Sequence, residues 1–144
     1  MTSLTPLVLG SPELPLQLTD LTRLAETDTR LELHPSTQQR TRPSRDLVER
    51  VQREERVVYG VNTGFGRLSS VRIEPDQVES LQRNLVRSHA AGVGDPLPQG
   101  TVRVVMALRI NSLLGGYSGV TQGLLDAFCA LYNSGVVPFV PSRG

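Results

Sequence analysis

Apolar residues recur at steps of three and four along most of the chain, which is the spacing of one helix face. This spacing predicts helices over residues 44–56, 74–90, 101–116 and 121–136. Over 74–90 the apolar stripe runs through Val78, Leu81 and Leu85, and Ser88 and His89 follow on the same face. The proline at position 75 suits the first turn of that helix, where its missing N–H costs little.

The first third of the chain is mixed. Residues 6–9 and 30–33 predict two short strands, and residues 19–26 predict a short helix capped by Thr19. Residues 34–43 are polar and broken by prolines, which favours a loop, and Ser44 is then the expected cap of the next helix.

The last two predicted helices are apolar over most of their circumference. Such helices either cross the middle of a domain or are covered by structure outside it. The apolar, proline-spaced segment 135–144 indicates a connection into further structure. We therefore expect a single, mainly α-helical domain over residues 1–144, with one or two short strands near its N-terminus.

Charge and composition exclude several classes of protein. The 15 basic and 14 acidic residues nearly cancel, and even the arginine-rich segment 40–56 has a net charge of only +2, which argues against nucleic-acid binding. No 18-residue apolar run or signal peptide is present, so we expect a cytoplasmic protein without a membrane span. Cys129, the only cysteine, is expected in the core, and His34 and His89 lack the spacing of a metal site.

The stretch VVYGVNTGFGRLSS, residues 57–70, is the first candidate for chemistry. The spacing of Gly60, Gly64 and Gly66 does not match a dinucleotide-binding loop, and a Walker A loop needs a lysine that the chain lacks. One remaining interpretation is a structural loop whose glycines adopt positive φ. The other is a turn that presents Tyr59, whose hydroxyl becomes a general base only in a site that favours the phenolate.

The second candidate is His89, just before the predicted helix ends at Ala90-Ala91-Gly92. An imidazole at this place interacts well with the negative end of the helix dipole. It can also lie at the edge of a pocket and exchange a hydrogen bond with a polar ligand. The residues alone leave both interpretations open.

Four motifs in order carry a resemblance: YGVNTGFG, then LQRNLVRSHAAGVG, then RINSLLGGYSGV, then VVPFVPSRG. Together they are similar to the N-terminal part of the aromatic amino acid ammonia-lyase family, from about residue 50 to residue 144. The resemblance implies the N-terminal helical domain of the ammonia-lyase superfamily, which has a fumarase/aspartase-like fold.

The resemblance also implies an activity: elimination of ammonia from an α-amino acid without oxidation. The family uses an electrophilic ring, 4-methylideneimidazole-5-one (MIO), which forms from an Ala-Ser-Gly of the protein and turns the substrate amine into a leaving group. No metal is implied. Tyr59 would be the base that takes the β-proton, on a loop that Gly60, Gly64 and Gly66 allow to close.

Substrate contacts follow from the same resemblance. Asn62 is assigned to substrate binding, and Ser88 and His89 to the substrate side chain. A histidine at this place suits a polar side chain, so L-histidine, which would give urocanate in histidine degradation, is the first expected substrate. Tyrosine, for an ammonia-lyase or an aminomutase, is the second.

One departure from the family is large, because the chain contains no Ala-Ser-Gly. In the family this tripeptide follows almost directly after the segment that matches Pro141–Gly144. The chain alone is therefore expected to be inactive, as a fragment or one piece of a split enzyme. Its expected partners are the amino acid substrate, the remainder of the lyase and further subunits of a homotetramer. A non-catalytic helical interaction remnant is the alternative.

Overall fold

The computed structural model describes residues 5–54, 56–64, 73 and 75–143. In chain order the elements are β1 (Leu7–Leu9), α1 (Leu18–Glu26), β2 (Leu31–Leu33), α2 (Ser36–Arg53), α3 (Pro75–His89), β3 (Val93–Pro96), α4 (Gln99–Leu113), α5 (Gln122–Asn133) and β4 (Pro141–Arg143). The expected mainly α-helical fold with short strands near the N-terminus is confirmed. None of the helices in the described ranges is long and apolar enough to span a membrane.

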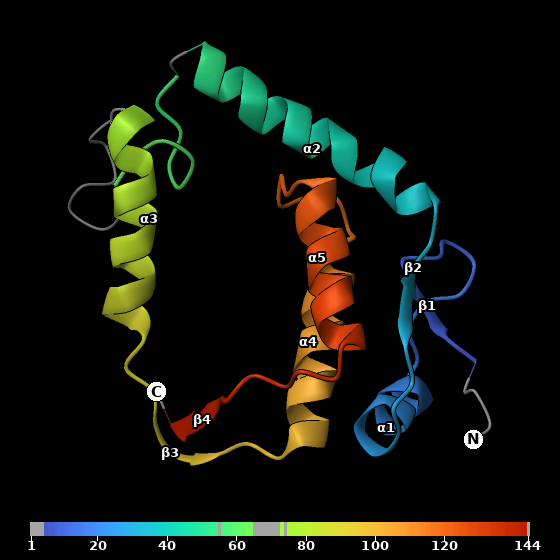
Figure 1. Cartoon of the computed structure of the whole chain (residues 1–144). Coiled ribbons are helices and arrows are strands. Elements are labelled where there is room, and N and C mark those ends of the chain that lie inside the picture. The colour runs from blue at the N-terminus through green and yellow to red at the C-terminus, as the bar shows by residue number, and fades with distance from the viewer. Residues whose placement is uncertain (1–4, 55, 65–72, 74, 144) are drawn as a thin grey trace.

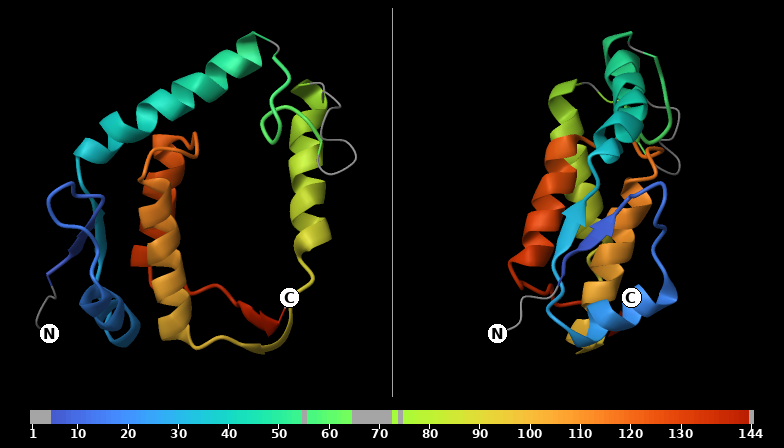
Figure 2. Two further views of the ribbon diagram at one scale, coloured as in Figure 1. Left: turned by 180° about the vertical axis from the view of Figure 1, so that it is seen from behind. Right: turned by 90° about the vertical axis from the view of Figure 1, so that its right-hand side faces the viewer.

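The helices form an open frame (Figure 1). α4 and α5 lie side by side in the middle, α1 and the β1–β2 pair lie on one side of them, and α2 crosses one end. α3 stands apart on the other side, and the reverse view shows the same separation (Figure 2). The frame closes at the end opposite α2, where β3 pairs with β4.

The core lies between α1, the β1–β2 pair, α4 and α5. Its buried members are Leu9, Leu24, Leu31, Val102, Met106, Ala107, Ile110, Leu113, Leu114, Leu125, Cys129 and Tyr132. β1 and β2 run parallel with Leu7 opposite Leu31 and Leu9 opposite Leu33, so their inward side chains reach α4 and α5 together. The prediction of a buried Cys129 is confirmed.

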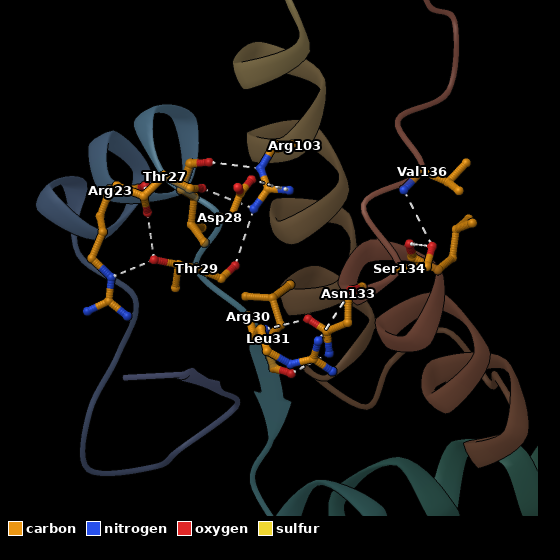
Figure 3. A network of polar contacts seen from close by, with 12 residues as sticks. Arg23, Thr27, Asp28, Thr29, Arg30, Leu31, Arg103, Asn133, Ser134 and Val136 are labelled. Carbon is orange, nitrogen blue, oxygen red and sulfur yellow. Dashed lines mark hydrogen bonds and ion pairs between the residues drawn. The ribbon is translucent and has the colours of Figure 1, made fainter. Parts of the chain in front are cut away.

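Hydrogen bonds from the Arg103 side chain link α4 to the end of α1 and to the connection between α1 and β2 (Figure 3). Its guanidinium donates to the carbonyls of Leu24 (3.3 Å), Thr27 (3.1 Å) and Thr29 (3.3 Å). The same group lies 4.7 Å from the centroid of the Tyr132 ring. One partly buried cation thus satisfies three carbonyls at the end of α1 and packs against α5.

The expected loop over residues 34–43 is wrong, because α2 begins at Ser36 and continues through Pro43. A proline inside a helix removes one N–H, which here would have served the carbonyl of Gln39. Gln39 is exposed, so water can serve that carbonyl instead.

Tertiary contacts hold the first half of α2 in place. Thr37 and Thr41 are buried, and Thr37 Oγ1 donates to the His34 carbonyl at 2.6 Å. Arg40 Nη2 donates to the Gly10 carbonyl, also at 2.6 Å. The Arg40 contact joins positions 30 residues apart, which local periodicity does not contain.

The two expected helix caps are also wrong. α1 begins one residue after Gln17, whose N–H donates to the Asp20 carboxylate at 2.9 Å, so Thr19 lies inside the first turn. Ser44 lies in the middle of α2, where its hydroxyl donates to the Thr41 carbonyl and accepts from the Gly119 N–H. Ser44 therefore joins α2 to the α4–α5 connection.

The pairing of β3 with β4 was not predicted. The two strands run antiparallel, with Val93 opposite Arg143 and Pro96 opposite Pro141, and with an irregularity between these pairs. Leu97 N also donates to the Val140 carbonyl at 2.9 Å. The expected connecting segment 135–144 thus ends, over its described residues, as the partner of the strand that follows α3.

Candidate functional site

Ser88 and His89 share one acceptor at the C-terminal end of α3. Ser88 Oγ and His89 Nδ1 each lie 2.9 Å from the Leu85 carbonyl oxygen, and 3.1 Å from one another. Both side chains are exposed in this chain. The imidazole therefore has a fixed position at the negative end of the helix dipole and also faces outward.

The β3–β4 pair brings the segment Pro141–Arg143 to this same end of α3. Two glycines permit the close approach. A Cβ added to Gly92 would lie 2.8 Å from Pro141 Cγ, and one added to Gly94, where φ is +89°, would lie 2.8 Å from Ser142 Oγ. Gly92 and Val93 come three and four residues after His89, and Val93 pairs with Arg143. A short connection therefore joins His89 to the β3–β4 pair.

Tyr59 lies in a turn that Asn62 stabilises. Asn62 Oδ1 accepts from Val58 N at 2.9 Å, and Asn62 Nδ2 donates to the Arg56 carbonyl at 2.6 Å. Tyr59 itself is 64% exposed. The turn thus presents the tyrosine ring outward, and the Asn62 amide bonds to the backbone on its N-terminal side.

The glycines of this turn differ in environment. Gly60 adopts φ +76°, as expected for a structural turn glycine, and its N–H donates to Thr63 Oγ1 at 3.3 Å. Gly64 is buried, and its carbonyl accepts from the same hydroxyl at 3.0 Å. Gly66, and the side chain of Val78 on the expected apolar stripe, lie outside the described residues.

The structure does not bring Tyr59 and His89 together. The Asn62 carbonyl accepts from Ile73 N at 3.0 Å, which places the turn near the N-terminal end of α3. His89 is the last residue of α3. A helix of this length spans roughly 20 Å at about 1.5 Å per residue, so the two candidates lie near its opposite ends.

Metal-ligating groups do not cluster in the described ranges, where no set of three His, Cys, Asp or Glu residues could hold an ion. The only cysteine lies in the core, close to Leu31, and burial raises the pKa of its thiol. Among the residues described, the polar groups at the end of α3 are therefore suited to hydrogen bonding.

Sequence reasoning missed two contributors to the site. One is the Leu85 carbonyl, since a backbone acceptor has no signature in side-chain chemistry. The other is the β3–β4 pair, whose residues Gly94, Asp95 and Pro141 have poor strand propensity. The closely spaced Gly92 and Gly94 were the available signal, since glycine in a strand often marks a close backbone approach.

The sequence and the fold match one family. Residues 16–144 match the model of the aromatic amino acid lyase family. The chain belongs to this family. Its fold is accordingly that of the ammonia-lyase superfamily, as the sequence motifs predicted.

The similar proteins include histidine ammonia-lyases and a tyrosine aminomutase. The histidine ammonia-lyase of Streptococcus gordonii is 45% identical over 129 residues, which are 90% of this chain and 25% of that protein. The solved structure of histidine ammonia-lyase from Trypanosoma cruzi covers 97% of this chain, with a TM-score of 0.86 and 34% identity over 26% of its own length. The tyrosine aminomutase of Streptomyces globisporus has the same TM-score of 0.86, 97% coverage of this chain and 26% of its own, but 29% identity.

The chain spans about a quarter of the length of these relatives. Along that quarter, the fold is shared by enzymes named for different substrates and reactions. The greater sequence identity is to the histidine ammonia-lyases.

Proposed function

We propose that residues 1–144 form the N-terminal domain of a histidine ammonia-lyase, which eliminates ammonia from L-histidine to give urocanate. The observation that carries the proposal is the β3–β4 pair, which places Pro141–Arg143 beside the end of α3 that bears Ser88 and His89. In the family, the MIO-forming Ala-Ser-Gly follows the segment that matches Pro141–Gly144. The reacting group would then form next to His89.

The residues present fit this group. The close contacts of Gly92 with Pro141 and of Gly94 with Ser142 leave no room for a Cβ, so the strand that leads to the group would be held firmly against β3. When present, MIO supplies an electrophile that makes the substrate amine a leaving group. Gly92 and Gly94 would hold its N-terminal flank, and Ser88 and His89 would face the substrate side chain.

Tyr59 would take the β-proton of the substrate at its hydroxyl oxygen. Because its turn lies near the far end of α3, the tyrosine must reach the site either by movement of the loop or from another subunit. Gly60, Gly64 and Gly66 would supply the backbone freedom for closure over the substrate. Asn62 would keep the turn in shape through its bonds to Arg56 and Val58, and contact substrate only after these bonds rearrange.

The complete enzyme would be a homotetramer, as the family resemblance implies, and its location would be the cytoplasm, as expected from the sequence. The remainder of the lyase would cover the exposed apolar side chains of the two central helices, Val105 and Leu108 on α4 and Leu124 and Leu131 on α5. Without that remainder the chain would be inactive, since it contains no Ala-Ser-Gly.

Tyrosine is the second candidate substrate, for an ammonia-lyase or an aminomutase. The shared fold of the tyrosine aminomutase favours it. A phenol, like an imidazole, can exchange a hydrogen bond with His89. Both amino acids should therefore be measured side by side.

A hybrid enzyme tests the proposal. Residues 16–144 would replace the matching segment of the Streptococcus gordonii histidine ammonia-lyase, whose own sequence supplies the remainder. We expect turnover of L-histidine, followed by the ultraviolet absorbance of its conjugated product, and little turnover of L-tyrosine. A hybrid that folds and assembles like its parent but leaves L-histidine unchanged would contradict the proposal.

A further inference from the structure

The two histidines of the chain contact backbone groups of opposite kind. His89 Nδ1 lies 2.9 Å from the Leu85 carbonyl oxygen. A carbonyl can only accept, so the nitrogen that faces it at this distance must carry a proton. A neutral His89 therefore has its proton on Nδ1 and a lone pair on Nε2.

Ser88 agrees with this assignment. Its Oγ lies 2.9 Å from the same carbonyl, so the hydroxyl donates there and presents a lone pair toward Nδ1 at 3.1 Å. In the opposite arrangement the hydroxyl would donate to Nδ1. The Nδ1 lone pair would then face the Leu85 oxygen at 2.9 Å with no proton between them, which is repulsive.

His34 shows the reverse pattern. Its Nδ1 lies 3.2 Å from the backbone nitrogen of Ser36, which can only donate. The Ser36 hydroxyl, 2.7 Å away, can donate to the same nitrogen. A neutral His34 therefore carries its proton on Nε2, which makes it an internal reference for His89.

We propose that the Leu85 carbonyl holds His89 in the Nδ1–H tautomer, so that Nε2 accepts a hydrogen bond from the ligand. The site then selects amino acids whose side chains present an N–H or O–H donor, and discriminates against rings that can only accept. The choice of ligand rests on the proposed function, whereas the tautomer depends only on the contacts within α3. Leu85 acts as a positioning residue, because its carbonyl reaches the ligand only through His89.

Nitrogen NMR tests the tautomer on the 144-residue chain. With ¹⁵N-labelled histidine at about pH 8, where an ordinary imidazole is mostly neutral, couplings to the ring protons identify the protonated nitrogen. We expect the Nδ1–H pattern for His89 and the Nε2–H pattern for His34, with a His34→Gln variant to assign the signals. Ser88→Ala should keep the His89 pattern, because the Leu85 carbonyl remains.

An Nε2–H pattern at His89, or the averaged pattern of free imidazole, overturns the proposal. Both results are independent of any turnover. Failure of the hybrid enzyme to act on L-histidine would instead count against the proposed function and leave the tautomer standing.

A matched pair of histidine analogues tests the choice of ligand in the hybrid enzyme. Triazolylalanine in which the side chain is attached through a ring carbon keeps a ring N–H, whereas thiazolylalanine offers only an acceptor nitrogen in a ring of similar size. We expect thiazolylalanine to inhibit L-histidine turnover at least about tenfold less strongly, since it leaves Nε2 without a donor. His89→Asn keeps a group near Leu85 but lacks the atom at Nε2, and should abolish the difference. Equal inhibition by the two analogues, or preference for thiazolylalanine, overturns the selection of donors.

Discussion

The side-chain amide of Asn133 binds both backbone polar groups of Leu31. Its Oδ1 accepts from Leu31 N and its Nδ2 donates to Leu31 O, each at 2.8 Å (Figure 3). The last residue of α5 therefore pairs with β2 as a neighbouring strand would. This contact joins positions 102 residues apart and satisfies backbone groups of a buried residue.

Asn133→Leu should destabilise the chain by about 2 to 4 kcal/mol. Leucine has a similar size but cannot form the hydrogen bonds that the amide makes with the N–H and the carbonyl of Leu31. The measurement is the free energy of unfolding in urea. Ser134→Ala is the control, since that exposed hydroxyl has only local partners, the Leu131 carbonyl at 2.7 Å and Val136 N at 3.4 Å, and it should change the value by less than about 0.5 kcal/mol. Similar losses in the two variants would show that the amide does not fasten α5 to β2.

Arg103 and Arg109 provide a second matched pair on α4. Sequence analysis did not single out Arg103, yet its side chain is only 12% exposed and it serves three carbonyls, whereas Arg109 is exposed. Arg103→Leu should cost about 2 kcal/mol or more, because buried carbonyls lose a charged donor. Arg109→Leu should leave the urea midpoint nearly unchanged, and a larger effect there than at position 103 would contradict this assignment.

Gly116 and Gly123 should respond to alanine with opposite signs. Gly116 has φ +83°, and an added Cβ would lie 2.5 Å from the Arg40 carbonyl oxygen, so Gly116→Ala should lower stability by at least about 1 kcal/mol. Gly123 lies in α5 with nothing within 4 Å of an added Cβ, so Gly123→Ala should raise stability by about 0.5 to 1 kcal/mol. Thermal unfolding of the two variants decides. Equal changes would mean that α2 does not depend on its close contact with Gly116.

Tyr59→Phe tests the proposed base. The ring is retained and only the hydroxyl oxygen is removed, so the unfolding midpoint of the hybrid enzyme should move little. Its kcat for L-histidine should fall by about 100- to 10,000-fold, the usual effect of losing a general base. Retained turnover would remove Tyr59 from that role.

Alkaline pH should destabilise the fold through Cys129 and Tyr132. Burial raises the pKa of both groups in the folded state. Above about pH 8.5 the unfolded thiol begins to ionise while the folded thiol stays neutral, so the contribution of Cys129 is complete below that pH and declines as the pH rises toward its folded pKa. Tyr132 adds a similar loss at higher pH.

Unfolding free energies measured at pH 7 and about pH 9.5 test this linkage. Cys129→Ala should show a smaller decrease between the two values than the unaltered chain, whatever its stability at pH 7. An identical decrease would mean that the thiol does not contribute.

The sequence predicted those elements whose stability is mainly local. α3, α4 and α5 carry continuous apolar positions at helical spacing, and each helix lies close to its expected range. The first half of α2 was missed because contacts such as that of Arg40 with the Gly10 carbonyl outweigh a polar, proline-containing sequence. β3 and β4 were missed because the residue pattern of neither segment alone predicts that Val93 pairs with Arg143.

The residues of the candidate site could also be predicted from the sequence, whereas their arrangement in space could not. The motifs pointed to Tyr59, Ser88 and His89, because these residues carry recognisable chemistry. Their arrangement depends on the backbone: the turn at Asn62 lies near one end of α3, and the strand pair lies at the other. Spacing along the chain did not indicate that the two halves of the site would be separated by the length of a helix.

The β3–β4 pair also constrains the order of folding. It closes a loop from Val93 to Arg143 that contains α4 and α5, so its formation must overcome the entropy of bringing distant positions together. During synthesis, β3 cannot pair until β4 has left the ribosome, whereas the residues of α1, β1 and β2 are synthesised much earlier. The strand pair beside the end of α3 that bears His89 is therefore among the last parts of the domain to form.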